Sequence, residues 1–389
     1  MKEVRKYYLL EFFSTLHLFG AVMIPMFLMW GKISQAQILF LQSWFMAWIF
    51  LLEVPTGVVA DFFGRKYSLA LGSFIIGIAA LLYGSAPHMS VFLVGEFLFA
   101  LGVSLWSGAD KALLYDLIVE LNLKDKKEEI FGRSKAFSFL GLLVAAPIGA
   151  YIAQHVSLNA PLLFTSIPLF VAAIVALIIK EPKRHSQEQE KTRYVEIMKK
   201  GWRYFRTHQD IPRITINAVI VAAAAYFVVW LYQNILTDLR ISLVFFGWVN
   251  ALLVGLELIV SSVYLQLVTF FGSKKRYLQF TALITTFGFF LVGFFPNKLT
   301  VLVFVATSGA LGLTRFEFIS FYLNDFIPSA QRATMLSFVS MVRRFALIII
   351  NPLVGLMIER LLYPTLILIG LLPFLSFFFP LERKKAAKN

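Results

Sequence analysis

Cysteine is absent from this sequence of 389 residues, and charged residues make up only 15% of it. Without cysteine the chain cannot form disulfides, thiolate metal sites or a cysteine nucleophile. The H-E-x-x-H, G-x-S-x-G and phosphate-binding-loop patterns are also missing, and no acidic cluster has the spacing of metal ligands. We therefore expect no cofactor, no bound metal, no enzymatic activity and no transport driven by ATP hydrolysis within this chain.

Apolar residues are abundant instead. They make up 59% of the chain, and the mean hydropathy is +0.77, whereas a soluble domain is ~45–50% apolar. A membrane-crossing helix needs ~20 such residues, so the apolar runs predict an all-α membrane protein with twelve transmembrane helices. The expected spans are 7–30, 36–60, 67–86, 89–118, 131–154, 158–180, 212–237, 243–270, 276–295, 299–326, 331–358 and 362–380.

The net charge of +14 would suggest nucleic acid in a soluble protein. Here the basic residues lie between apolar runs and alternate in density from loop to loop, so we expect no nucleic-acid partner. The pattern predicts a multi-pass protein of the cell membrane with both termini in the cytoplasm. The first run is too long for a signal peptide. The loops predicted to lie on the side opposite the cytoplasm carry only four basic residues, which are Lys32, Arg240, Lys298 and Arg360.

One long polar segment, 181–211, divides the chain into two similar parts. Residues 1–180 and 212–389 would each form a six-helix bundle, and 181–211 would be a cytoplasmic loop. Within this loop, apolar residues recur at helical spacing over 194–205, which is typical of a helix on a membrane surface.

Short motifs recur at equivalent places in the two parts. Phe63-Gly64-Arg65-Lys66 returns as Phe271-Gly272-Ser273-Lys274-Lys275, at the turn between the second and third spans of each part. Leu114-Tyr115-Asp116 returns as Leu323-Asn324-Asp325, and Pro147 has its counterpart in Pro352. Their shared order predicts two pseudo-symmetric bundles.

The stretch Gly57–Lys66 reads G-x-x-x-D-x-x-G-R-K. It resembles the signature loop of the major facilitator superfamily, although Phe62 stands where that family often has a basic residue. The resemblance implies alternating access between two bundles and a latch of charged residues at the cytoplasmic side. The residues implied for this gate or latch are Gly57, Asp61, Gly64, Arg65, Lys66, Asp116, Arg133, Asp325 and Arg332.

The fifth span contains Gly132, Gly141 and Ala145-Ala146-Pro147-Ile148-Gly149. This pattern resembles the glycine–proline motif of the superfamily's antiporters, which favours export.

Four carboxyl groups inside predicted spans are candidates for proton coupling, because an ionisable side chain within the membrane is costly and usually functional. Glu96 and Asp110 would share one helical face with Val103 and Ser107 and line a cavity. Glu257 lies mid-span among leucines, and Glu11 lies in the first span. The alternative for Glu257 is a protonated acid that bonds to a neighbouring helix, and the alternative for Glu11 is a partner for Arg5 or another interfacial charge.

Other polar and aromatic residues in the spans are candidates for a substrate cavity. Arg315 could bind an anionic substrate, and Glu317 could pair with Arg343 or Arg344. His17 could be a packing residue or a proton relay. Aromatic residues near span centres would suit a bulky apolar or cationic compound. The cavity candidates are His17, Trp44, Trp106, Ser107, Tyr226, Trp230, Arg315, Glu317 and Arg343.

These observations predict a secondary transporter that exports lipophilic or cationic small molecules in exchange for protons. Proton-coupled uptake of a polar or anionic metabolite and lipid flipping on the same scaffold are the alternatives. The expected partners are a small-molecule substrate, protons and membrane lipid, and we expect a monomer.

Overall fold

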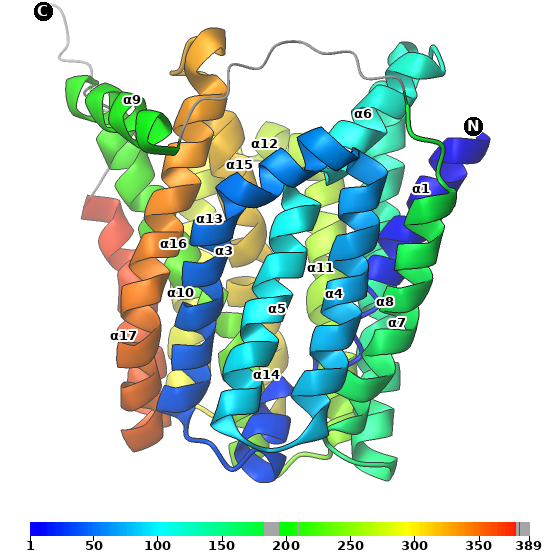
Figure 1. Ribbon diagram of the computed structural model, residues 1–389. Coiled ribbons are helices and arrows are strands. Elements are labelled where there is room, and N and C mark those ends of the chain that lie inside the picture. The colour runs from blue at the N-terminus through cyan, green and yellow to red at the C-terminus, as the bar shows by residue number, and fades with distance from the viewer. Residues whose placement is uncertain (183–193, 209, 379–380, 382–389) are drawn as a thin grey trace, which may run out of the picture. The chain divides into compact units, whose positions relative to one another are not determined.

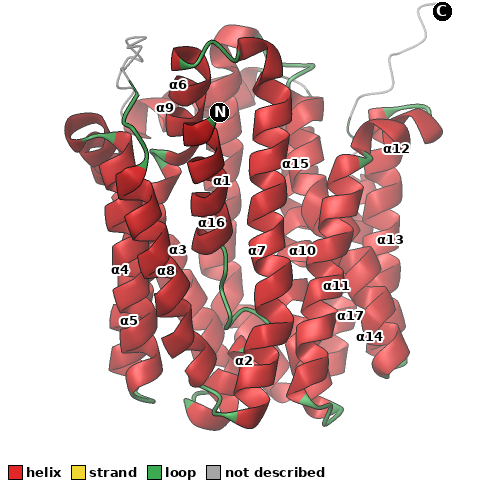
Figure 2. Cartoon of the chain, turned by 90° about the vertical axis from the view of Figure 1, so that its right-hand side faces the viewer, coloured by secondary structure: helices red, strands yellow, loops and turns green. Residues whose placement is uncertain are grey.

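The computed structural model describes residues 1–182, 194–208, 210–378 and 381. The side chains of 54, 58, 61, 194–198, 329–331 and 333 lie outside the description as well. The described residues form helices and short connections, and no strand occurs among them (Figures 1 and 2). The chain divides into two units. Unit 1 comprises Met1–Glu190 and Ile241–Val254, and unit 2 comprises Lys191–Arg240 and Gly255–Asn389.

Unit 1 is built from eight α-helices and the first half of a ninth. They are α1 (Lys2–Ser14), α2 (Met23–Pro25), α3 (Gln35–Phe63), α4 (Arg65–Ser85), α5 (Met89–Ser107), α6 (Asp110–Glu120), α7 (Lys127–His155), α8 (Ala160–Ile178) and the start of α11 (Leu243–Ser262). A π-helical turn, Met26–Trp30, follows α2.

Unit 2 contains the remaining helices. They are α9 (Tyr194–Thr207), α10 (Ile211–Asp238), the end of α11, α12 (Tyr264–Phe270), α13 (Lys274–Phe294), α14 (Lys298–Phe304), α15 (Gly312–Leu323), α16 (Ser329–Arg360) and α17 (Leu362–Leu375). A π-helical segment, Val305–Leu311, joins α14 to α15, and a 3-10 turn, Ser376–Phe378, follows α17.

Ten described helical segments are long and apolar enough to cross a membrane, and Leu362–Phe378 is a shorter apolar helix. The chain is therefore an all-α multi-pass membrane protein. The expected span 7–30 is interrupted: α1 ends at Ser14, and the loop that follows is plain in Figure 2. The Ser14 and Thr15 hydroxyls both donate to the Glu11 carbonyl, so side chains compete there with the helical ladder.

The beginning of α11 belongs to unit 1, although the sequence places it in the second half. Gly247 explains this packing, because a Cβ there would lie 2.7 Å from the Ala146 carbonyl oxygen on α7. The Gln154 side-chain oxygen also accepts a hydrogen bond from the Leu243 amide at 3.0 Å. Close contact of backbones through a small residue is the usual way in which membrane helices associate.

Candidate functional site

Asp110 begins α6 directly after a break in the fourth predicted span. α5 ends at Ser107, and the chain turns at Gly108 and Ala109 before helix resumes. The helical face expected to join Glu96, Ser107 and Asp110 therefore ends at Ser107. The break places a carboxyl group in the first turn of α6, where the amide groups of a helix N-terminus favour negative charge.

Tyr7 connects this carboxyl group to Glu11. Its hydroxyl donates to the Glu11 carboxylate at 2.9 Å and lies in close contact with a carboxylate oxygen of Asp110. Asp110 and Ser134 also lie within hydrogen-bonding reach of the Glu11 carboxyl. Tyr7 and Glu11 are buried and Asp110 is half-buried. We call Glu11, Tyr7 and Asp110 the acid site.

Glycines of α7 hold the end of α1 in place. A Cβ at Gly141 would lie 2.4 Å from the Thr15 hydroxyl, and a Cβ at Gly149 would lie 1.6 Å from the Leu18 carbonyl oxygen. Only glycine fits such contacts, so α7 lies directly against the chain that follows the acid site. The glycines of the fifth span thus position α1.

Glu96 lies elsewhere, buried where α3, α4 and α5 meet. Its Oε1 accepts from the Gln42 side-chain amide and from the Tyr83 hydroxyl, each at 3.0 Å. Tyr83 stacks on Phe92 with 5.1 Å between ring centroids. The described contacts of Glu96 are thus with neutral donors inside helix packing.

The signature stretch ends in an ion pair at the start of α4. Arg65 pairs with Asp116 of α6, and the same guanidinium donates to the Ala112 carbonyl at 2.8 Å. The Asp116 side chain is only 5% exposed. Gly64, between α3 and α4, has a φ of +114°, a backbone conformation that favours glycine.

Glu181 was not among the predicted residues, yet it caps α4. Its two carboxylate oxygens accept from the backbone amides of Arg65, at 2.8 Å, and Lys66, at 3.0 Å. A carboxylate at a helix N-terminus satisfies free amides and is favoured by the helix dipole. The residues are 116 apart in sequence, and Glu181 stands at the start of the polar segment, where a charge is unremarkable.

The other predicted latch residues of unit 1 lie apart from this pair. Arg133 pairs with Glu129 on its own helix, and both side chains are at least half exposed. Among the described residues Arg65 and Arg133 thus belong to separate ion pairs, and the latch that they would form with Asp61 stays a prediction. Gly57 lies on α3, where its Cα is 3.4 Å from the position of a Cβ on Gly108. The side chain of Asp61 lies outside the described residues.

Unit 2 has a corresponding ion pair. The Lys274 ammonium, at the start of α13, contacts both carboxylate oxygens of Asp325 at 2.7 and 3.0 Å. Arg332 is exposed and donates to the Ile327 carbonyl at 3.1 Å, within the turn that precedes and begins α16.

Arg315 is only 2% exposed, among helices of unit 2. Its guanidinium donates to the Asn217 side-chain oxygen at 2.6 Å and to the Leu278 carbonyl at 3.2 Å. Arg343 lies over the Phe316 ring, 4.0 Å from its centroid, which is a cation–π contact. Glu317 is exposed and Glu257 is half-buried.

The remaining cavity candidates are mostly packed within their own units. Trp44 donates to the Leu93 carbonyl and Trp106 to the Ser73 hydroxyl, each at 3.0 Å. His17 stacks on Phe19, with its Nε2 buried and unpaired within the described residues. Ser107 is exposed, Tyr226 is half-buried, and Trp230 is buried.

Comparison with known families finds one that matches more than half of the chain. The sequence pattern of the family described as Major Facilitator Superfamily matches residues 7–234. An uncharacterized transporter of Buchnera aphidicola is 37% identical over 98 residues, which are 25% of this chain and 24% of that protein. An uncharacterized MFS-type transporter of Methanocaldococcus jannaschii is 23% identical over 143 residues, or 36% and 35% of the two chains. The matches therefore span only a quarter to about a third of these relatives.

Solved structures share the fold over nearly the whole chain. A crystal structure of the nucleoside transporter NupG has a TM-score of 0.82 at 12% identity and covers 97% of this chain and 98% of its own. A D-xylose–proton symporter has a TM-score of 0.71 at 14% identity and covers 98% of each chain. At such low identity the likeness shows the fold alone.

Proposed function

Because the chain belongs to the Major Facilitator Superfamily, we propose that it is a proton-coupled transporter that exports lipophilic or cationic small molecules by alternating access. In this proposal the acid site carries the coupling. The supporting observation is that two carboxyl groups from different helices converge on one tyrosine hydroxyl inside an apolar bundle.

The chemistry of the acid site provides two states that differ by one charge. Two neighbouring carboxylates repel each other, and burial makes each charge more costly, so binding of one proton relieves both effects. The Tyr7 hydroxyl then donates to the carboxylate that remains ionised. A proton that lowers the energy of one conformation more than that of another shifts the balance between them. Alternating access requires such a difference in how strongly the proton stabilises the two conformations.

A cationic cargo can take the place of the proton. The ionised pair attracts positive charge, and Asp110 is half-buried next to the exposed Ser107 and Gly108. If a cation and the proton exclude each other at one site, release of one accompanies binding of the other, which is exchange. Glu96 is less suited to this role because it is 5% exposed and already accepts two hydrogen bonds from neutral donors.

Transport in proteoliposomes tests the proposal. With acid inside the vesicles, an exchanger accumulates a cationic substrate inside as protons leave, and a symporter does not. We expect Glu11→Gln and Asp110→Asn to lower this accumulation by about tenfold or more, which corresponds to ~1.4 kcal/mol or more. Glu96→Gln is the matched control for removal of a buried carboxylate, and it should retain coupling.

If Glu11→Gln and Asp110→Asn both accumulate substrate as the parent does, the acid site is not the coupling site. If Glu96→Gln or Glu257→Gln alone abolishes the pH dependence, the coupling belongs to that residue instead.

A second candidate function is proton-coupled uptake of an anionic metabolite. The observation that favours it is the Nε of Arg343, which is buried and unpaired within the described residues. A carboxylate or phosphate of a substrate could accept this hydrogen bond. Accumulation of such a substrate in vesicles that are alkaline inside, lost in Arg343→Gln, would support uptake over export.

A further inference from the structure

Unit 1 carries an apolar groove on its surface, lined by residues of α3, α4 and α8. Its volume is about 840 Å³. The small side chains of Ala70 and Ala173 lie at its floor and are 6% and 7% exposed. Larger apolar side chains stand along it, and they include Leu71, at 45% exposure, and Ile174, at 61%. A row of small residues between rows of large ones thus leaves a slot open to the surroundings of the bundle.

The groove is bounded at one end by two aromatic rings. Phe74 of α4 and Phe170 of α8 contact each other with 5.5 Å between ring centroids. From Tyr67 to Phe74 the helix rises ~10 Å, at ~1.5 Å per residue. This length suits about the upper half of one extended acyl chain, with the remainder leaving the groove beside the rings.

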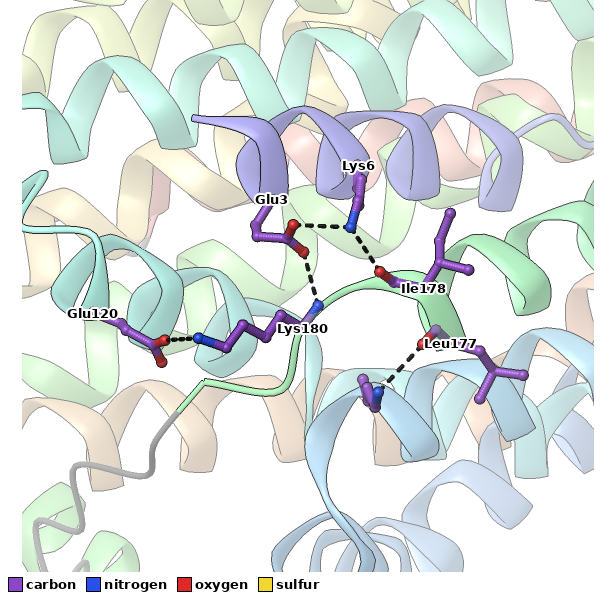
Figure 3. A network of polar contacts seen from close by, with 7 residues as sticks. Glu3, Lys6, Glu120, Leu177, Ile178 and Lys180 are labelled. Atoms are coloured by element: carbon purple, nitrogen blue, oxygen red, sulfur yellow. Dashed lines mark hydrogen bonds and ion pairs between the residues drawn. The ribbon is translucent and has the colours of Figure 1, made fainter.

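A cation stands at the other end. The Lys66 ammonium donates to the carbonyl of the groove residue Leu177 at 3.3 Å, the contact drawn to Leu177 in Figure 3. It also lies 5.0 Å from the ring centroid of Tyr67, another groove residue. The Glu181 carboxylate is engaged by the backbone amides of Arg65 and Lys66. The Lys66 ammonium thus lies at the mouth of the slot, beside Leu177 and Tyr67. Its described side-chain contacts include no carboxylate, because the Glu181 carboxylate accepts from backbone amides instead.

We propose that this groove binds an anionic phospholipid, with one acyl chain in the slot and the phosphate on Lys66. Charge complementarity determines the occupant. An apolar slot alone would accept any lipid tail, but a primary ammonium at its mouth favours a net negative headgroup. The site lies on the surface of unit 1 and does not involve the acid site, so it is independent of the proposed transport mechanism.

Binding of defined lipids to the full-length protein in detergent tests this site. The probes are phosphatidylglycerol and phosphatidylcholine with the same acyl chains, phosphatidylethanolamine, and glycerol 3-phosphate. We expect phosphatidylglycerol to raise the melting temperature saturably and to be retained in native mass spectra, and the other three to do so weakly. Lys66→Gln should weaken phosphatidylglycerol binding about fivefold, the share expected of one lysine near an anionic surface.

Two further variants locate the lipid. Ala173→Leu fills the floor of the slot and should weaken binding while Lys66 is intact. Lys127→Gln is the matched control, because the Lys127 ammonium, like that of Lys66, lies over a tyrosine ring, 4.9 Å from the centroid of Tyr115. Lys127 is exposed and Lys66 is half-buried. It should leave binding unchanged. If Ala173→Leu fails to fold, the Lys66 and Lys127 variants still decide the headgroup.

Equal binding of phosphatidylglycerol and phosphatidylcholine, or unchanged binding in Lys66→Gln, would overturn the proposal. Phosphatidylethanolamine that binds as tightly as phosphatidylglycerol would also overturn it, because net charge would then not be the basis of selection. If glycerol 3-phosphate raised the melting temperature as much as phosphatidylglycerol, the acyl chain would not contribute to binding and the proposal would be overturned.

Discussion

Units 1 and 2 each contain an ion pair at an equivalent place in the chain, and the two pairs differ in how far they are buried. In each unit, the first residue of a helix is basic and pairs with an aspartate 51 residues later: Arg65 of α4 with Asp116, and Lys274 of α13 with Asp325. In unit 1 the aspartate side chain is 5% exposed and the arginine 24%. In unit 2 the lysine is 36% exposed and the aspartate 51%. The recurring motif thus forms a largely buried ion pair in unit 1 and an exposed ion pair in unit 2.

The difference extends to what surrounds each pair. The guanidinium of Arg65 reaches both Asp116 and the Ala112 carbonyl, and Glu181 caps the same helix. In unit 2 the start of α13 is capped by the Ser273 hydroxyl, which accepts from the Arg276 amide at 3.2 Å. Removal of one partner destabilises a protein much more when the ion pair is buried than when it is exposed. The comparison therefore predicts an unequal dependence of the two units on their pairs.

The largest expected effect comes from Asp116→Asn. It leaves the Arg65 guanidinium without its anion in a largely desolvated place, so we expect a loss of about 2–3 kcal/mol in the free energy of unfolding. Chemical denaturation in detergent measures it. A loss no greater than that of Asp325→Asn would contradict the comparison.

Arg65→Lys tests what the planar guanidinium adds. Lysine retains the charge but cannot match the two contacts with the same geometry, so we expect a loss of about 1 kcal/mol. The reciprocal Lys274→Arg is the control and should be close to neutral. A neutral Arg65→Lys would show that charge alone accounts for the ion pair in unit 1.

Glu181→Gln tests the cap on α4. Loss of the negative charge at a helix N-terminus should cost about 0.5–1 kcal/mol, measured by the same denaturation. A serine at position 273 already caps α13 without charge, so Ser273→Ala offers a comparison of the two caps. If Glu181→Gln has no effect while Ser273→Ala does, the cap of unit 1 is dispensable.

The pair of unit 2 should matter least. Because both partners of Lys274–Asp325 are more than a third exposed, solvent screens them, and Lys274→Gln should cost about 0.5 kcal/mol or less. This small effect should vanish at high salt, whereas that of Asp116→Asn should persist.

A pH dependence arises at Glu3, where α1 meets the chain after α8 (Figure 3). Partial burial opposes ionisation, but hydrogen bonds from the Lys180 amide and the Lys6 ammonium outweigh it and lower the pKa of the Glu3 carboxyl below its ordinary value. The stabilisation is present above the ordinary pKa and is lost as the pH falls through the lowered one. We expect Glu3→Gln to remove a small acid-dependent fall in melting temperature. An unchanged acid profile would refute this.

Sequence reasoning reached the helical membrane fold because each span is recorded locally, in ~20 consecutive apolar residues. The length of an apolar run does not indicate where the helix within it is interrupted. The breaks after Ser14 and Ser107 lie within continuous apolar runs. Interrupted helices inside a bundle are tolerated when neighbouring groups satisfy the free amides and carbonyls, and hydropathy does not report those neighbours.

The partners of the charged residues were harder to predict. The sequence pattern marks Glu11 and Asp110 as separate candidates and gives no signal for the Tyr7 hydroxyl that connects them, although Tyr7 lies one helical turn before Glu11. Glu96 was expected to share a face with Asp110 but packs among other helices. Arg133, a predicted latch residue, pairs with Glu129 on its own helix.

Composition and the order of apolar runs by themselves determined that this chain spans a membrane as helices, because lipid leaves few other ways to satisfy a backbone. The tertiary structure alone decided which charges meet. Tyr7 and Asp110 are 103 residues apart, and Arg65 and Glu181 are 116 apart. Such contacts depend on how helices cross, and crossing is set by close packing of small side chains that carry no charge signal of their own.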